Sequence, residues 1–290
     1  MILAILLTAG ILYGQEKDTT YWQHSERTGF NFNTAAFSSN WTGGGTNNIS
    51  LSALFLGNWN YKKDKIGWDN ALDLQYGILK NKDQNARKSN DLIYMDSKLG
   101  YTISKNWNLF TALNFQTQFA KGYQFGTDDN GAETRALISK FLAPAFITSS
   151  WGVEYKPNEF FSLRISPFSP RITLVTDTTL HNQLSGNYGV EVGETVRNEW
   201  LAAKVAASFE KDLVENIHFK ARYELFVNFQ ELETNRWDHR LDLALSAKVF
   251  KAITVSLMST LIYDFDQIDE LQTNFLTGIG LLYTFGNMAE

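Results

Sequence analysis

Apolar and polar residues alternate strictly over one long segment of the chain. Every second residue from Ile217 to Phe229 is apolar, and the residues between them include His218, Lys220 and Arg222. Successive side chains of a β-strand point to opposite faces, so this segment forms a strand with one apolar and one charged face. The same pattern recurs and predicts twelve strands, over residues 30–39, 48–61, 66–79, 92–103, 107–120, 142–156, 160–175, 196–210, 217–230, 236–249, 253–264 and 273–285.

The lengths of these strands and of their connections favour a membrane barrel. A tilted strand crosses a bilayer with about 9–11 residues, whereas strands of soluble sheets average about 5–6. The expected connections 62–65, 104–106, 157–159, 211–216 and 250–252 are short, and 81–90, 121–141 and 176–195 are long. Short periplasmic turns and long extracellular loops are typical of outer-membrane barrels. The sequence therefore predicts an all-β fold, a single transmembrane antiparallel up-and-down β-barrel.

The predicted outer face supports this interpretation. Ile253, Val255 and Leu257 lie outward in one strand, and no charged residue falls on that face in the predicted mid-membrane stretches. One Lys or Arg there costs about 2–4 kcal/mol near the midplane. Aromatic residues such as Tyr61 and Trp237 lie near the strand ends, where a barrel places two aromatic girdles.

The first residues predict export. The apolar run Met1–Tyr13 is too short for a transmembrane helix and suits the apolar core of a secretory signal, with the small Gly14 before a cleavage site. We expect a signal peptide over 1–14, a periplasmic N-terminal segment over 15–29 and the barrel over 30–286. The expected location is the cell outer membrane of a Gram-negative bacterium.

Composition narrows the range of partners. The net charge is −5, which argues against nucleic-acid binding, and the chain has no cysteine for disulfides, thiolate catalysis or thiolate metal sites. We expect outer-membrane lipid and lipopolysaccharide around the barrel and no cofactor. Envelope proteins are expected partners through the extracellular loops or the periplasmic N-terminal segment.

Charged residues on the opposite face are predicted to line the lumen. These are Asp69, Asp73, Asp96, Lys98, Arg164, Lys204, Lys220, Arg222, Glu224, Arg240 and Asp242, with Glu154, Glu210, Asp238, Asp264, Arg171 and Lys248 on the same register. One interpretation is a transverse field at the constriction of a selective pore. The preferred one is a network of paired charges that fills a small barrel, because buried charges must be paired. We expect Lys220, Arg222, Glu224, Arg240 and Asp242 to contact one another.

Two features modify the register. Pro167 and Pro170 interrupt the strand 160–175, and the shift of its apolar phase predicts a one-residue bulge. Large apolar residues, Trp200 and Phe226 among them, are also predicted to point inward. They favour a plugged interior, or a pocket for a hydrophobic ligand near the outer mouth, over an open aqueous channel.

A catalytic site finds little support. His239 lies on the predicted lipid face, but the outward Ser259 pairs opposite Leu243, four residues away, so the two side chains are too far apart for a hydrogen bond. No second histidine accompanies His218 at a metal-ligand spacing. The sequence thus predicts no catalytic residues and no metal site.

The segment from Phe37 to Asn47, with its Asn40, Trp41 and glycine cluster, resembles an outer-membrane β-barrel family of the Bacteroidota, domain of unknown function 3078. The resemblance extends over most of the mature chain and to its glycine-rich aromatic C-terminus. It implies a location and a fold, and it supplies neither an activity nor site residues.

Three functions stay open at this point. The first is a non-enzymatic structural or accessory barrel of an envelope complex with a packed polar lumen. The second is a narrow channel for small solutes. A remote third is an outer-membrane hydrolase.

Overall fold

The computed structural model describes residues 21–38, 46–182, 187–250 and 253–287. Its strands are β1 (Trp22–Ala35), β2 (Asn48–Lys63), β3 (Ile66–Asn81), β4 (Arg87–Ser104), β5 (Trp107–Thr117), β6 (Gly122–Thr127), β7 (Glu133–Ser139), β8 (Ala145–Tyr155), β9 (Phe161–Phe168), β10 (Arg171–Leu174), β11 (Val196–Glu199), β12 (Ala202–Val214), β13 (Ile217–Asn228), β14 (Asp238–Phe250), β15 (Ile253–Asp264) and β16 (Ile268–Gly286). Three short 3₁₀ helices are η1 (Thr178–Asn182), η2 (Asn187–Gly189) and η3 (Thr234–Arg236). None of the helices in the described ranges has the length and hydropathy that a membrane span requires.

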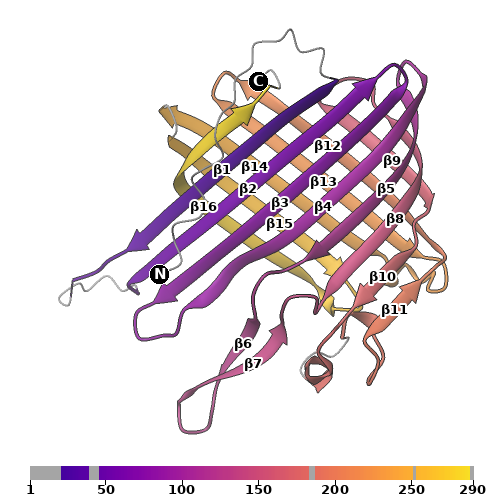
Figure 1. Cartoon of the computed structure of the whole chain (residues 1–290). Coiled ribbons are helices and arrows are strands. Elements are labelled where there is room, and N and C mark those ends of the chain that lie inside the picture. The colour runs from indigo at the N-terminus through magenta and orange to yellow at the C-terminus, as the bar shows by residue number, and fades with distance from the viewer. Residues whose placement is uncertain (1–20, 39–45, 183–186, 251–252, 288–290) are drawn as a thin grey trace, which may run out of the picture.

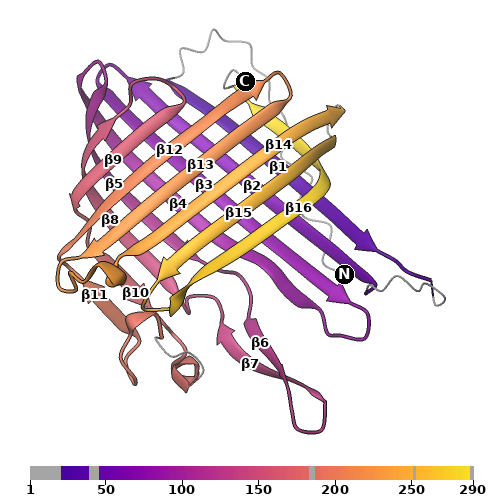
Figure 2. The same ribbon diagram turned by 180° about the vertical axis from the view of Figure 1, so that it is seen from behind.

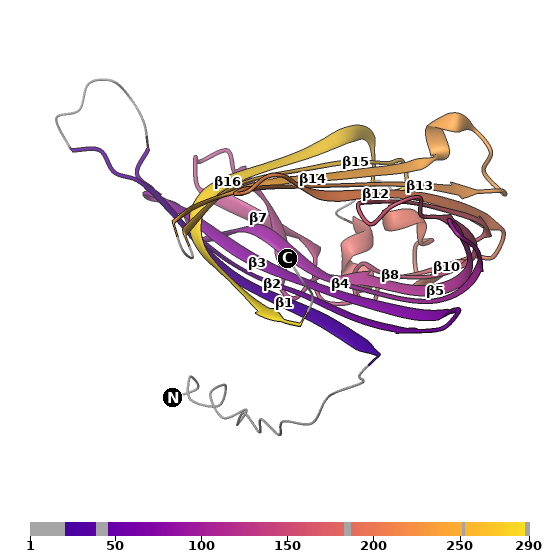
Figure 3. The ribbon, with the colours of Figure 1, turned by 90° about the horizontal axis from the view of Figure 1, so that it is seen from above.

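All strands except the β6–β7 pair form one antiparallel sheet that closes on itself (Figures 1 and 3). Around the barrel, β1 to β5 are followed by β8, by β9 with β10, by β11 with β12, and by β13 to β16, which returns to β1. β10 continues β9 and β12 continues β11 after short interruptions, so the barrel has twelve strands. The predicted fold class is confirmed.

The two ends of the barrel differ, as the connection lengths predicted. One end, which we call the turn end, carries the short connections 64–65, 105–106, 156–160 and 215–216. The opposite loop end carries the connections 118–144 and 175–195, and the first of them contains the β6–β7 hairpin (Figure 1). The predicted loop 81–90 is shorter, because β4 already begins at Arg87.

The one-residue bulge predicted for the strand 160–175 is present. Val153 of β8 pairs with Ile165 of β9, yet Trp151 pairs with Phe168, so β9 carries one extra residue between these pairs. Gly152 lies opposite the bulge, where a Cβ atom would overlap the carbonyl oxygen of Ile165. A glycine is therefore needed for the bulged strand to approach β8 closely.

A second interruption, between β11 and β12, was not predicted. The predicted inward position of Trp200 is wrong, since Trp200 is 59% exposed and its neighbour Leu201 is 55% exposed. Glu199 and Ala202 on either side are almost fully buried. Two adjacent exposed side chains shift the alternation by one residue, so the faces of β11 and β12 follow opposite parities.

The first strand begins earlier than predicted. Residues from Trp22 onward pair with β2, so residues 22–29 belong to the barrel and not to a separate N-terminal segment. Alternate positions here carry Trp22, His24, Glu26 and Thr28, and apolar alternation starts only with Phe30. The predicted signal peptide, the rest of its adjoining segment and the glycine cluster 43–45 lie outside the described residues.

Aromatic side chains gather at both ends of the outer face. At the turn end the Trp22 ring contacts those of Tyr61 and Trp68, with centroids 5.3 and 5.7 Å apart. At the loop end the His239 ring lies between those of Tyr223 and Tyr263. Amphipathic rings at these two levels mark the borders of an apolar band.

The loop end has a small apolar core of its own. Ala143, Val175, Leu180 and Val190 are almost completely buried there. Tyr188 packs against this cluster, and its ring meets that of Phe146 of β8 edge to face. Connection 175–195 is thereby held against the mouth of the barrel.

The bulge supplies a stability test. We expect Gly152→Ala to destabilise the barrel by about 1–3 kcal/mol, because the new methyl group collides with the backbone of β9. Urea-induced unfolding in detergent micelles measures the change. Gly100→Ala is the matched control, since its Cβ atom would meet nothing closer than 3.8 Å. Equal stability of the two variants would contradict the role assigned to Gly152.

Candidate functional site: the charged lumen and its cavity

Near the turn end the lumen holds a compact ion-pair cluster built by β3, β4, β8 and β9. The Lys98 ammonium nitrogen lies 2.6 Å from a Glu154 carboxylate oxygen and 2.9 Å from one of Asp69. The Arg164 guanidinium binds Asp96 at 2.9 Å and Glu154 at 3.3 Å. Lys98 and Glu154 are buried, so each charge depends on its partners for stabilisation.

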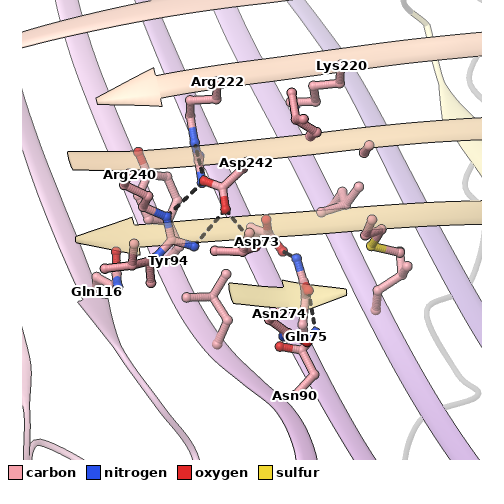
Figure 4. A pocket seen from close by; sticks show the side chains of 18 of the residues that line it. Asp73, Gln75, Asn90, Tyr94, Gln116, Lys220, Arg222, Arg240, Asp242 and Asn274 are labelled. Atoms are coloured by element: carbon pink, nitrogen blue, oxygen red, sulfur yellow. Dashed lines mark hydrogen bonds and ion pairs between the residues drawn. The ribbon is translucent and has the colours of Figure 1, made fainter. Parts of the chain in front are cut away.

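A second cluster lies in the middle of the barrel wall (Figure 4). Arg222 of β13 and Arg240 of β14 both donate to the Asp242 carboxylate, at 3.0 and 2.8 Å. The Arg222 guanidinium also lies 4.5 Å from the ring centroid of Tyr94, on β4. Because β4 and β13 are on opposite sides of the barrel, this cation–π contact crosses the lumen.

Another contact joins opposite walls nearer the turn end. Arg27 of β1 donates to Glu210 of β12 over 3.1 Å. The same carboxylate lies 3.0 Å from the Lys220 ammonium and 3.2 Å from the His218 ring. Glu210 thus connects three strands across the interior.

The loop-end cluster joins two predicted lumenal residues to Glu199 and Arg197, which the sequence register missed. Arg171 of β10 binds Glu199 at 2.6 Å and Asp238 at 2.6 Å, and its guanidinium lies 3.8 Å from the Phe226 ring centroid. Arg197 of β11 pairs with carboxylates of two loop-end connections. The pair of adjacent apolar residues after Glu199 was the one feature of the sequence that indicated the change of parity.

The predicted lumen residues are distributed over these clusters. Among Lys220, Arg222, Glu224, Arg240 and Asp242, the two arginines share Asp242, whereas Lys220 pairs with a carboxylate of β12 and Glu224 pairs with the Lys204 ammonium at 3.0 Å. The five therefore do not form one contact group, because neighbouring strands on the β12 side supply closer partners.

Asp73 differs from the other predicted charges. Gln75 donates a hydrogen bond to its carboxylate over 2.9 Å, and Asn90 in turn donates to Gln75 over 2.6 Å. No base lies within ion-pair distance of Asp73 in the described part of the chain. A chain of amides, and not an ion pair, holds this carboxylate (Figure 4).

A cavity of about 610 Å³ lies between these walls. It extends from Arg27 and His218 near the turn end to Tyr188 and Gln267 at the loop end. The wall formed by β1 to β5 and β16 is rich in the side-chain amides of Asn and Gln residues. Three of these, Asn58, Gln116 and Asn274, make no side-chain hydrogen bond within the described structure. The opposite side carries the paired charges of β12 to β15, so the cavity has an amide wall and an ionic wall.

The lipid-facing histidine has no serine partner among the residues that the structure describes. His239 Nδ1 lies 2.8 Å from the Tyr223 hydroxyl oxygen, and Ser259 pairs opposite Leu243, as predicted. Within the described ranges no group of His, Cys, Asp and Glu residues has the arrangement of a metal site. The geometry therefore assembles no hydrolytic triad around His239.

Comparisons with known proteins support the predicted family resemblance only in part. The family model "Protein of unknown function (DUF3078)" matches residues 32–123, and a different model, "Protein of unknown function, DUF481", matches residues 171–285. The first match is thus shorter than the predicted resemblance over most of the mature chain, and the second belongs to another family. None of the curated proteins compared with the chain matches it.

Several solved outer-membrane barrels are distantly similar in fold. The translocator domain of the autotransporter NalP from Neisseria meningitidis has a TM-score of 0.41 and 8% identity, covering 93% of this chain and 90% of that one. An outer membrane channel from Pseudomonas putida F1 has a TM-score of 0.41 and 8% identity, with 95% and 100% coverage. The NanC porin has a TM-score of 0.38 and 7% identity, with 89% and 98% coverage. The fold assignment itself rests on the strand register.

An ion pair outside the membrane-spanning strands ties connection 175–195 to the loop before β8. The Lys140 ammonium lies 2.8 Å from the Asp177 carboxylate, and the Thr179 hydroxyl and amide also donate to it. These hydrogen bonds, first of all that from Lys140, hold the pKa of Asp177 below its usual range. Burial raises the pKa of the Tyr188 phenol in the same connection to about 12, so that this group stays neutral.

The lowered pKa of Asp177 predicts an acid-sensitive loop. A depressed carboxyl pKa contributes stability above the unfolded value of about 3.9, and this is lost as the pH falls through the folded value. In Lys140→Met we expect the Asp177 pKa to move back toward 3.9, so that hydrogen-exchange protection of residues 177–180 is lost at a higher pH. Lys121→Met, in the same loop, is the control. If the pH at which this protection is lost were the same in Lys140→Met as in the wild type, Lys140 would not be the group that lowers the Asp177 pKa.

The buried turn-end cluster predicts a large stability effect. Lys98→Met leaves Glu154 with one cationic partner fewer inside the barrel, and we expect a loss of about 3–5 kcal/mol of unfolding free energy. The partly exposed pair of Lys140 supplies the comparison, where Lys140→Met should cost at most about 1 kcal/mol. Urea titrations of both folded barrels measure the difference, and similar losses would show that the Lys98 cluster is not a buried network.

Proposed function

We propose that this chain is an integral protein of the cell outer membrane and serves as a non-enzymatic structural or accessory barrel. The location is supported by the closed sheet, by its apolar outer face and by the aromatic rings at both ends. Lipid and lipopolysaccharide surround the barrel in this proposal. The source is a Gram-negative bacterium, and a source in the Bacteroidota stays a prediction.

The contacts across the lumen carry the structural role. The Arg222 guanidinium on Tyr94 and the Arg27–Glu210 ion pair each join opposite walls, at two levels of the barrel. A hydrated ion that crosses the lumen would have to separate these paired groups. The barrel is therefore proposed to be closed to steady ion flow.

Surfaces for envelope partners are proposed at the loop end. The β6–β7 hairpin projects beyond the barrel (Figure 1). Glu133 of the hairpin binds Arg87 at the start of β4 over 2.7 Å, and the Arg87 guanidinium lies 4.3 Å from the Phe125 ring centroid. A hairpin fixed in this way presents a defined surface to a partner. Purification of the full chain from native membranes in mild detergent measures whether a stable partner accompanies it.

A narrow channel for small solutes is the second candidate, because the cavity of about 610 Å³ reaches toward both ends of the barrel. In a channel the contacts across the lumen would separate to let a solute pass. Steady conductance of the wild-type protein would favour this candidate.

Planar-bilayer recording separates the two candidates. We expect the protein, purified with detergent from the outer-membrane fraction, to carry no steady current, because side chains from opposite walls close the lumen. The triple variant Arg27→Ser, Tyr94→Ala, Arg222→Ser removes both contacts across the lumen and is expected to conduct in discrete steps. Tyr101→Ala is the matched control, since it removes a ring that is 48% exposed elsewhere on β4.

Two results would contradict the proposal. A steady current through the wild-type barrel would exclude the closed lumen and support the channel. Recovery of the protein from a soluble fraction without detergent would exclude the membrane location.

A further inference from the structure

The seam between the first and last strands closes over only part of its length. β1 pairs with β16 from Ser25↔Gly286 to Phe32↔Ile279. Beyond Phe32, β1 continues to pair with β2 alone. Within the described ranges, β16 from residue 268 to residue 278 pairs with β15 on one edge and with no strand on the other. Figure 2 shows β16 and β1 diverging toward the loop end.

The open part of the seam lies within the apolar band of the outer face. Leu271 and Phe275 of β16 are 59% and 61% exposed, and Ile49 and Leu51 of β2 are 43% and 46% exposed. Unpaired backbone groups are tolerated at membrane depth only where they are buried in protein or line a water-filled cavity. The free edge of β16 therefore requires a polar cavity or an occupant behind it.

Such a cavity is present behind the seam. A smaller pocket of about 50 Å³ lies at the lip of the opening and is lined by Asn33 of β1 and Gly278 of β16, among others. Asn31, Met258 and Leu276 line both this pocket and the large cavity. The small pocket therefore lies next to both the opening and the amide-walled cavity.

The residues that line the large cavity and the small pocket indicate which class of ligand could bind there. The cations of the large cavity, Arg222 and Lys204 for example, already have carboxylate partners, so the described part of the cavity offers no unpaired cation to an anionic ligand. Asp73 and Asp264, its carboxylates without an ion pair in the described structure, accept hydrogen bonds from Gln75 and Gln267. The amides of Asn58, Gln116 and Asn274 are free to bind hydroxyl groups. Apolar side chains, among them Leu54 and Met258, occur where the pocket meets the seam.

We propose that an amphiphile with an uncharged, hydroxyl-rich head group and an alkyl tail enters the barrel sideways from the membrane, between β1 and β16. Its head group binds the amide wall, and its tail lies in the open seam. This inference goes beyond the structural role, because a barrel closed to ions along its axis can still admit a lipid-like molecule through its wall.

Photolabelling in a bilayer tests the proposal. The probe is dodecyl β-D-glucoside with a diazirine at the end of its chain, added to the full-length protein in phosphatidylcholine nanodiscs. We expect saturable labelling of peptides that contain Leu54, Met258 or Leu276. Unlabelled dodecyl glucoside should compete, and dodecyl sulfate and glucose, which lack the neutral head and the tail respectively, should not.

Neighbouring substitutions at the opening supply matched variants. Gly278→Phe places a ring in the small pocket, and we expect the saturable labelling to be lost. Thr273→Phe adds the same ring on the outward face of β16, at a position that lines neither the small pocket nor the large cavity, and should leave the labelling unchanged. Gln116→Leu removes one free amide. It should raise the probe concentration needed for half-maximal labelling by about fivefold, which is the equivalent of one hydrogen bond. If Gly278→Phe does not assemble, Asn33→Phe and its neighbour Thr34→Phe test the other lip of the seam.

Three outcomes would overturn the proposal. Unchanged labelling in Gly278→Phe, or labelling that does not saturate, would show that the probe only adsorbs to the outer face. A polypeptide that cross-links to the edge of β16 and blocks the probe would show that the seam receives a β-strand of another protein. Bilayer conductance is measured independently, so failure here leaves the closed-lumen proposal standing.

Discussion

The bilayer requires every backbone polar group to be paired and every ionised side chain to be kept away from hydrocarbon. A closed antiparallel sheet satisfies the first requirement, because each strand supplies the hydrogen-bond partners of the next. The strict period of two satisfies the second, because it sends charges such as Lys220 and Arg222 to one face only. The closed sheet and the polar interior both follow from these two requirements.

Charges gathered on the inner face create a second problem, which the barrel solves by pairing them. Lys98, Glu154 and Arg164 neutralise one another at the turn end, and Arg171 with Glu199 and Asp238 does so at the loop end. Such networks fix the spacing of the walls and occupy the lumen. The space left between them is the amide-walled cavity, which lies behind the incompletely paired seam between β1 and β16.

Much of the fold could be predicted because the bilayer makes the sequence pattern unusually strict. Apolar alternation located the strands, and the change of apolar phase along the strand 160–175 predicted the bulge that lies in β9. The prediction failed where the outward positions of a strand are polar, or where the alternation of apolar residues changes phase. The first residues of β1 place His24 and Glu26 at alternate positions, and the predicted register did not include the second change of parity at Trp200 and Leu201. That change hid the lumenal roles of Glu199 and Arg197.

The sequence by itself determined which face of each strand meets lipid, and therefore the barrel and its polar interior, because side-chain alternation is a local property of the extended chain. Only the tertiary structure decided which charges meet. Arg27 reaches Glu210, and Arg222 reaches Tyr94, across the lumen from strands far apart in the sequence. Those contacts depend on the curvature of the closed sheet and on its two interruptions. The incomplete seam has the same origin, since it arises where the first and last strands diverge in space.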